Sequence, residues 1–316
     1  MNSIARAFSV LKYLVLLVVL LVALSVTWLR WESGLSRDDW FDDRQGRIES
    51  LSSEKSVTQF GQQSESVRLV SDSGLGVFFR IIREPTTGPP LPVLLILGGH
   101  RTGSDAIDLF GHVGNRAIVG IDYPYDGPEK VKGLLPIVKT IPLARQAFLD
   151  TTPAVSLVID WLVQQPWVDT ERVIVVGASL GVPFAATAAA RDARITGVML
   201  VHGAADNRLW LKTQVARRID TKLLHDPLAT LLHWLAYGPV LDTAKHIATI
   251  SPRPVLIVAA RDDERTPAGQ AELLLEAARE PKRLVYTEGR HIQPNRKEIV
   301  AELWRIADEQ LEFLTR

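Results

Sequence analysis

Residues 173–181 read VIVVGASLG, a short apolar run that leads into a G-x-S-x-G pentapeptide, and this stretch decides the fold. An alanine-rich segment of helical character follows directly, up to Arg191. In this context of strand, turn and helix, small residues on both sides of Ser179 let the backbone close sharply and expose the hydroxyl at the carboxyl end of the strand. The pattern predicts a nucleophilic serine. The alternative for the same residues is a buried serine that caps the helix.

The alternation of short apolar runs and helical patterns extends over residues 67–316. The predicted strands are Val67–Ser71, Val77–Arg83, Val93–Leu97, Ala117–Asp122, Arg172–Val176, Ile195–Val201, Val255–Ala260 and Arg283–Tyr286. The predicted helices are Thr151–Gln165, Leu180–Arg191, Ala268–Arg279 and Asn295–Leu314. The later runs are continuously hydrophobic, which is typical of parallel strands buried on both faces. We expect an α/β domain with a mostly parallel eight-stranded sheet, helices on both faces, and ligands beyond the carboxyl ends of the strands.

Residues 203–250 interrupt this alternation. They carry leucines and tryptophans at largely helical spacings and no convincing strand, so a helical insertion between two strands fits them best. As a cap over the site, the insertion would present Trp210 and Trp234 to an apolar acyl or alkyl group. The alternative is plain scaffolding, with both tryptophans in the core.

A serine hydroxyl needs a base to take its proton, and that base is commonly a histidine oriented by a carboxylate. His291 stands on a loop shortly after the last predicted strand. Four other histidines lie in helical or inserted segments, where surface or packing roles are expected: His112, His225, His233 and His246. The residue pattern therefore favours His291 as the base.

The carboxylate is less well defined by the pattern. Asp262, Asp263 and Glu264 follow the predicted strand at 255–260, and Asp206 follows the strand at 195–201. At least two of the first three must have no role in orienting the histidine, because one histidine needs one carboxylate. The positions alone leave the choice open.

The order of serine, acid and histidine, the G-x-S-x-G turn and the eight-strand alternation resemble the α/β-hydrolase fold over residues 67–316. Residues 159–173 resemble the helix and strand before the serine turn in the dienelactone-hydrolase and acyl-peptidase-like branch. In that branch the acid commonly stands in a G-x-x-D-x-x-V-P loop, which falls here on residues 260–267. The resemblance therefore implies Asp263 as the acid, and the family's G-x-H falls on His291.

The same family forms its oxyanion hole from two backbone N–H groups. The resemblance places one at Leu180, after the nucleophile, and the other at His100, in a loop where Gly98 replaces the family's histidine. Gly99 would let the backbone approach a substrate closely, and Arg101 would add charge there or be solvated. Three departures from the family's usual Gly, Val and Gly remove no catalytic group: Ala260, Thr266 and Val182.

The resemblance implies a serine hydrolase that cleaves a small-molecule carboxylic ester or thioester through an acyl-enzyme. Ser179 would attack, His291 would act as base and then as acid, and Asp263 would orient His291. No cofactor and no metal is required, and no H-E-x-x-H pair suggests one. Two alternatives remain: an acyltransferase on the same triad, and a non-catalytic membrane-anchored binding protein of hydrolase fold.

The composition excludes several classes of function. The chain has 316 residues with 36 Lys+Arg against 36 Asp+Glu and no long basic run, so we expect no nucleic-acid partner. It has no cysteine, which excludes disulfides, zinc-thiolate sites, iron–sulfur ligation and a thiol nucleophile. A hydrophobic share of 47% is typical of a globular chain with a full core.

The first thirty residues are a different kind of sequence. Residues 13–29 carry no charge, and as a helix they would rise about 26 Å, at the short limit for crossing a bilayer core. With Arg6 and Lys12 before them, we expect residues 1–30 to be an uncleaved, single-pass signal anchor. A cleaved signal peptide is the rival, because residues 23–25 are Ala-Leu-Ser, and cleavage there would make the protein secreted or periplasmic. A buried soluble helix is the third possibility. Several arginines follow the segment, so charge counting leaves its orientation open.

Residues 31–66 are rich in Ser, Asp, Glu, Arg and Gln. We expect them to form a polar linker, with Trp40 and Phe41 docking on the domain; contact of these two side chains with lipid headgroups is the alternative. The predicted organisation is therefore an anchor over residues 1–30, a linker over 31–66, and a hydrolase domain over 67–316 that includes the cap.

Overall fold

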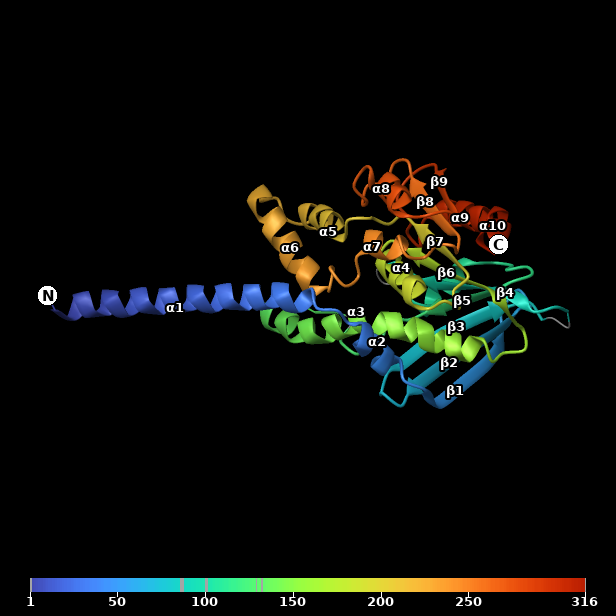
Figure 1. The fold of residues 1–316 in the computed structure, drawn as a ribbon, viewed down its shortest axis with the longest axis horizontal. Coiled ribbons are helices and arrows are strands. Elements are labelled where there is room, and N and C mark those ends of the chain that lie inside the picture. The colour runs from blue at the N-terminus through green and yellow to red at the C-terminus, as the bar shows by residue number, and fades with distance from the viewer. Residues whose placement is uncertain (1, 86–87, 100–101, 129, 132, 316) are drawn as a thin grey trace.

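The computed structural model describes residues 2–85, 88–99, 102–128, 130–131 and 133–315. Within them, nine strands form one sheet in the order β1-β2-β3-β5-β4-β6-β7-β8-β9 (Figure 1). The strands are β1 (Ile48–Val57), β2 (Gln63–Ser71), β3 (Gly76–Arg83), β4 (Leu91–Leu97), β5 (Ala117–Ile121), β6 (Val168–Ala178), β7 (Gly197–Val201), β8 (Val255–Ala260) and β9 (Lys282–Thr287). Neighbours from β5 to β9 run parallel, whereas β1, β2 and β3 are antiparallel to their neighbours. The mostly parallel sheet is confirmed and all eight predicted strands form, but the expected number of strands was one too low, because β1 adds a ninth.

Alternate residues of each central strand belong to two different cores, because successive side chains of a strand point to opposite faces of the sheet. In β4, Val93, Leu95 and Leu97 belong to the core under α3 (Leu134–Leu162), α4 (Gly181–Arg191) and α8 (Gln270–Ala277). Leu94 and Ile96 belong to the core under α9 (Lys297–Glu309) and α10 (Leu311–Leu314). The expectation of helices on both faces is confirmed.

The connection between β4 and β5 contains little helix to cover the sheet. Parallel strands are usually joined by a full helix, but here the described part of the connection forms only the short 3-10 helix η1 (Ser104–Leu109). On this face of the sheet, the core between η1 and α9 is therefore less completely filled by side chains than the core on the opposite face. This is where the cavity described below lies.

Helix α3 is longer than the sequence indicates. The predicted helix over 151–165 is the second half of α3, which begins at Leu134 and continues through Pro142 and Pro153. A proline inside a helix removes one backbone hydrogen bond, so its presence argued against a helix in the first half. The other backbone hydrogen bonds of α3 are enough to continue the helix across both prolines.

The expectation of a polar linker over residues 31–66 is wrong. Asp38–Gln45 form helix α2, where Phe41 is buried and Arg44 pairs with the buried Asp150 at 2.8 Å. Residues 48–57 form β1, which pairs with β2 along its whole length. Nearly every side chain of β1 is exposed, so its stability comes from backbone hydrogen bonds to β2 and it leaves no hydrophobic pattern in the sequence.

The inserted segment between β7 and β8 is helical, as its spacings indicate. It contains α5 (Asn207–Ala216), η2 (Lys222–Leu224), α6 (His225–Leu235) and α7 (Thr243–Ile247). Because α7 packs on α4 and α8 in the main helix layer, only residues 207–235 stand apart as a cap. Figure 1 shows α5 and α6 standing away from the sheet.

Helix α1 (Asn2–Ser33) projects from the body of the molecule (Figure 1). Its segment Phe8–Ser33 is long and apolar enough to cross a membrane, with a mean hydropathy of 2.6 and none of its most apolar window buried by the rest of the chain. The sequence predicts the same property, a helix long and apolar enough to cross a membrane, for residues 13–29.

Candidate active site

Ser179 occupies a strained turn between β6 and α4. Its φ of 54° lies in the left-handed region, which a residue with a side chain rarely adopts, and its N–H donates to the Val201 carbonyl of the neighbouring strand at 2.8 Å. The turn requires small neighbours: a Cβ on Gly181 would lie 2.1 Å from the Leu97 carbonyl oxygen, and one on Gly177 would lie 2.7 Å from Ala185. The geometry matches the sharp turn predicted from the pentapeptide.

The structure brings Ser179, His291 and Asp263 together from three loops at the carboxyl ends of β6, β9 and β8. The Oγ of Ser179 lies 2.8 Å from Nε2 of His291, and Nδ1 of His291 lies 3.0 and 2.9 Å from the two carboxylate oxygens of Asp263. The imidazole is 1% exposed. The arrangement places a proton acceptor beside the serine hydroxyl and a carboxylate on the other ring nitrogen, so it is suited to activate the hydroxyl as a nucleophile.

Asp263 is held as an anion. Burial raises the pKa of this carboxyl, but the hydrogen bond and charge of His291, with the N–H groups of Thr266 and Arg265 at 2.8 Å each, bring its pKa below the ordinary value. The other acids considered have different positions. Asp262 is exposed, and Asp206 accepts the Leu209 N–H as the N-cap of α5.

Glu264 supports the loop that carries His291. It accepts the backbone N–H of His291 at 3.0 Å and pairs with Arg296 at 2.8 Å. Arg296 also donates to the His291 carbonyl at 2.5 Å. Burial raises the pKa of Glu264, but the hydrogen bonds from Arg296 and His291 outweigh it and lower the pKa to about 2. Glu264 and its partner Arg296 thus hold His291 by its backbone N–H and its carbonyl, and within the described part of the chain neither side chain bonds to the imidazole ring.

His202 is a buried neighbour of His291 that the sequence reasoning did not single out. It follows β7 directly, its φ is 51°, and its ring centroid lies 5.7 Å from that of His291. Its Nδ1 accepts the Ile292 N–H at 2.9 Å, and its Nε2 lies 3.2 Å from the hydroxyl of Thr287. Burial, with the charge of His291, lowers the pKa of His202 to about 4. The signal available in the sequence was its place directly after a predicted strand.

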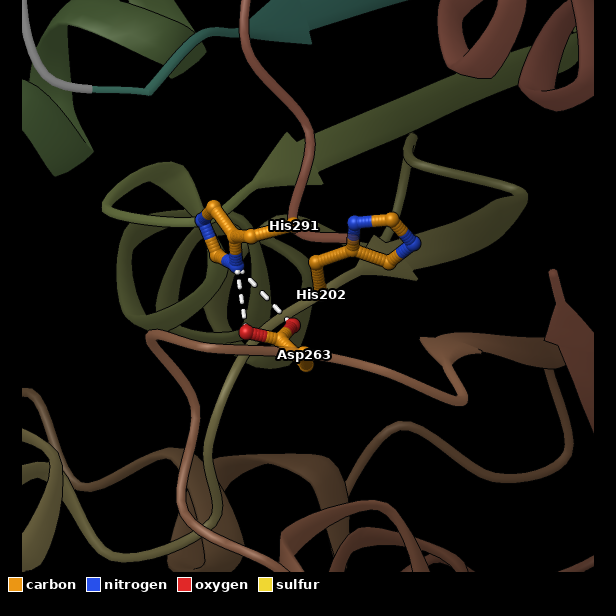
Figure 2. Close-up of side chains that lie close together, drawn as sticks. All are labelled: His202, Asp263 and His291. Carbon is orange, nitrogen blue, oxygen red and sulfur yellow. Dashed lines mark hydrogen bonds and ion pairs between the residues drawn. The ribbon is translucent and has the colours of Figure 1, made fainter. Parts of the chain in front are cut away.

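His202, Asp263 and His291 offer ligand atoms within 4.8 Å of one another, the spacing of a metal site. Figure 2 shows hydrogen bonds joining His291 to Asp263, whereas none joins His202 to either. Both ring nitrogens of His202 already have partners in Ile292 and Thr287. Because a metal ligand needs a free lone pair, the hydrogen bonds would have to break before these residues held an ion.

Part of the expected oxyanion site is described. Gly99 lies against the serine, since a Cβ placed on it would be 3.5 Å from Cβ of Ser179. The Gly98 carbonyl accepts the Tyr123 hydroxyl at 2.6 Å, which fixes the start of this loop. The Leu180 N–H has no hydrogen-bond acceptor within the described part of the chain. His100 and Arg101 lie outside the described residues.

An apolar cavity of about 870 Å³ opens beside Ser179. Its upper part is lined by α5 and α6 of the cap, through Trp210, Leu211, Leu228 and Leu231 among others. Its deeper part reaches the sheet face between η1 and α9, at Leu94, Ile96, Met199, Leu303 and Trp304. The sequence did not predict this deeper part, because it depends on the small size of η1 and on the packing of α9.

The two cap tryptophans lie in different places. Trp210 lines the cavity, and its buried indole N–H has no partner within the described part of the chain. Trp234 does not line the cavity, which corrects the expectation for this residue.

Known proteins resemble this chain in sequence and in fold. A model of the prolyl oligopeptidase family matches residues 151–308, which include Ser179, Asp263 and His291. No curated protein matches the sequence. The acetyl xylan esterase from Paenibacillus sp. R4 is similar in structure, with a TM-score of 0.62 and 14% identity over 85% of this chain and 93% of that one. The acetyl xylan esterase 1 from Thermoanaerobacterium sp. JW/SL YS485 has a TM-score of 0.56 and 17% identity over 88% and 96% of the two chains. The puromycin-hydrolyzing peptidase of Mycobacterium tuberculosis has a TM-score of 0.58 and 18% identity, over 81% of this chain and 40% of that one. At these identities, the likeness shows a shared fold.

Proposed function

The chain belongs to the prolyl oligopeptidase family, and from this membership we propose that it is a serine hydrolase that cleaves carboxylic esters with an apolar acyl or alkyl group. The observation that carries the proposal is the 2.8 Å contact between Ser179 Oγ and His291 Nε2, made in a strained turn beside an apolar cavity. A cavity of this kind binds an apolar group by removing its surface from water.

In this proposal Ser179 is the nucleophile. His291 takes the hydroxyl proton as Oγ attacks the ester carbonyl carbon, and Asp263 stabilises the imidazolium that forms. His291 then gives the proton to the leaving alkoxide as the ester bond breaks, which leaves an acyl-enzyme. A water molecule repeats the sequence with His291 again as base, and it releases the carboxylic acid and free Ser179.

The oxyanion of the tetrahedral intermediate needs donors that are fixed before the reaction. The Leu180 N–H at the start of α4, which has no acceptor among the described residues, is one donor, and the N–H of His100 is the second by resemblance to the family. Gly99 leaves room for the substrate next to Ser179, because a side chain there would contact it.

Two other reactions use the same acyl-enzyme. Peptide cleavage is favoured by the name of the family, and acyl transfer to an alcohol differs only in the acceptor. The mostly apolar lining of the cavity favours an ester or thioester over a peptide, because a peptide backbone needs hydrogen-bond partners along its length.

The test uses p-nitrophenyl esters from acetate to long acyl chains, with the wild type and Ser179→Ala. We expect hydrolysis by the wild type, faster with longer chains, and a loss of at least about 10³-fold in Ser179→Ala. A fluorophosphonate should label the wild type with one equivalent and leave Ser179→Ala unlabelled. Equal rates in the two proteins would reject Ser179 as the nucleophile, and added alcohols or peptide substrates would distinguish the two other reactions.

We also propose that α1 stays attached as a signal anchor. The helix continues without interruption through residues 23–25, where a signal peptidase would have to bind an extended backbone. Its last turn carries Glu32, which hydrogen-bonds to Arg145 and Tyr237 of the body. The expected result is that mass spectrometry of the membrane-bound protein finds an N-terminus before residue 23, and an N-terminus at residue 26 would contradict it.

A further inference from the structure

The end of α1 is fixed to the body by a cluster of charged side chains. Glu32 accepts hydrogen bonds from Arg145 of α3 at 2.5 Å and from the Tyr237 hydroxyl at 3.0 Å, and it also pairs with Arg37. Arg145 donates to the last two carbonyls of α6 at 3.2 and 3.1 Å. The side chains of Glu32 and Arg145 are 13% and 14% exposed, so water competes little for these bonds. The cluster joins α1, α3 and α6 at one junction and fixes their directions.

From this junction the start of α3 projects away from the sheet. Arg145 follows the first residue of α3, Leu134, by eleven positions, which is about 16 Å along a helix. Figure 1 shows this end of α3 projecting in the same direction as α1. Leu135, Ile137 and Val138 on it are 67%, 47% and 52% exposed.

The tip of the cap projects on the same side. Helix α6 runs from His225 to the junction at Leu235, so its first residue is also about 15 Å away. The 3-10 helix η2 precedes it directly, with Leu223 84% exposed and Leu224 44% exposed. In Figure 1, α6 runs mainly across the direction of α1, with its start tilted toward the side to which α1 extends.

These two ends lie on the side of the body to which α1 extends, and we call their exposed apolar side chains together the docking surface: Leu135, Ile137, Val138, Leu223 and Leu224. Lys139 and Lys222 adjoin it, and neither has an ion-pair partner within the described part of the chain. Exposed leucines beside unpaired lysines are typical of segments that lie at a membrane surface, where the apolar groups enter the lipid and the amines meet anionic headgroups.

Helix α1 marks where such a membrane would end. Tyr13 stands at one end of its uncharged stretch, and Trp28 and Trp31 stand at the other, 59% and 62% exposed. Tyrosine and tryptophan gather at the boundary between acyl chains and headgroups. The boundary near the body therefore falls close to the junction, and both ends of the docking surface lie on the bilayer side of the junction.

We propose that the docking surface lies in the headgroup and upper acyl region of the same bilayer that α1 crosses. The occupant is lipid because α1, apolar on every side, leaves the body at the junction, and the docking surface lies on the side of the junction to which α1 extends, so the lipid that covers α1 also reaches that surface. The cavity is lined by Arg218 and Ile219, a few residues before η2, so one end of it lies next to the docking surface. An ester dissolved in the bilayer then enters the cavity without crossing water, a step that rests on the proposed function.

The first test measures lipid contact in full-length protein in vesicles of phosphatidylcholine and phosphatidylglycerol. The chain has no cysteine, so single cysteines are labelled without background. An environment-sensitive fluorophore on Leu223→Cys or Leu135→Cys should shift to blue emission and be quenched by brominated phospholipid. Leu51→Cys on β1, a leucine that is 50% exposed, is the matched control and should not be quenched.

Val18→Cys, in the middle of α1, separates the possible failures. Quenching at position 18 with none at 223 and 135 would overturn the docking surface and leave the anchor intact. No quenching at any of the three positions would overturn both. Protection of 223 and 135 from an aqueous thiol reagent without quenching would mean that protein, such as a second copy of the chain, covers the surface, and it would also overturn the proposal.

The second test measures entry of the substrate. Neither Leu135 nor Leu223 lines the cavity, so Leu135→Glu with Leu223→Glu should leave hydrolysis of soluble p-nitrophenyl acetate unchanged. The same double variant should lose several-fold in the rate on a long-chain ester embedded in vesicles, and Leu51→Glu should lose nothing. An unchanged vesicle rate would overturn entry from the bilayer. A wild type inactive on both esters would count against the proposed function, and the lipid-contact measurement does not depend on that outcome.

Discussion

His202 provides a quantitative test of how the site is held together. Its Nδ1 accepts the Ile292 N–H, so the ring must be neutral at that nitrogen, and its Nε2–H is then directed to Thr287. Replacing His202 with Asn keeps an acceptor at the place of Nδ1 and removes the titration. Replacing it with Leu removes both, and it leaves the Ile292 N–H without its acceptor at a cost of about 1–3 kcal/mol.

The magnitude follows from the pKa of His202. The unfolded chain binds a proton at this residue near its ordinary value of 6.5, and the folded chain binds it at about 4, because burial and the charge of His291 oppose the proton. Between these values the unfolded state holds more protons, so stability is full above pH 6.5 and is lost as the pH falls toward 4. The full loss is roughly 3 kcal/mol, of which about 2 kcal/mol falls between pH 7 and pH 4.5.

The assay is urea unfolding of the full chain in detergent at pH 7 and pH 4.5. His202→Asn should lose about 2 kcal/mol less than the wild type between the two pH values. His233 and His246, whose pKa values burial also lowers, titrate in both proteins and cancel in the comparison. In ester hydrolysis at pH 7, His202→Asn should keep most of kcat and His202→Leu should not. An equal acid loss in the wild type and His202→Asn would refute the reasoning.

The other parts of the site lead to further predictions. Asp263→Asn should keep the fold and lower kcat by about 10³–10⁴-fold, because the amide cannot hold His291 in the required tautomer; a drop under tenfold in ester assays would count against this role. Gly181→Ala should lower the thermal midpoint and the activity together, since its Cβ would lie 2.1 Å from a backbone oxygen, and normal values for both would show that the turn relaxes without cost. Trp210→Ala should change the preference for acyl-chain length, whereas Trp234→Ala should leave it unchanged because that side chain does not line the cavity; equal profiles for both would reject the assignment.

The central part of the fold was predictable because burial on two faces leaves a clear trace in the sequence. The runs around Val93, Val173 and Val255 are continuously apolar, and all of them are central parallel strands. The start of α3 was missed because Pro142 interrupts the helical pattern there. The junction around Glu32 was missed because Arg145 is 113 residues away in the sequence, and no local pattern links them.

In the candidate site, too, some residues could be predicted from the sequence and others could not. Ser179 and His291 were found because each follows a strand in a short motif that the chemistry requires. Asp263 could be separated from its acidic neighbours only by resemblance to a family, since burial and hydrogen bonding distinguish the three carboxylates and a sequence shows neither. Gly99 lies beside the serine as expected, but the depth of the cavity depends on how α9 packs.

The exposed strand β1 has a consequence for the molecule in solution. It pairs with β2 on one side only, so its other side presents ten residues of backbone to which a strand of another molecule could add. Glu49, Glu54 and Lys55 stand along it, and charges at such an edge oppose pairing between molecules because they would have to be desolvated together. The polar composition of β1 therefore explains why no hydrophobic pattern predicts this strand, and it also protects the sheet edge from aggregation.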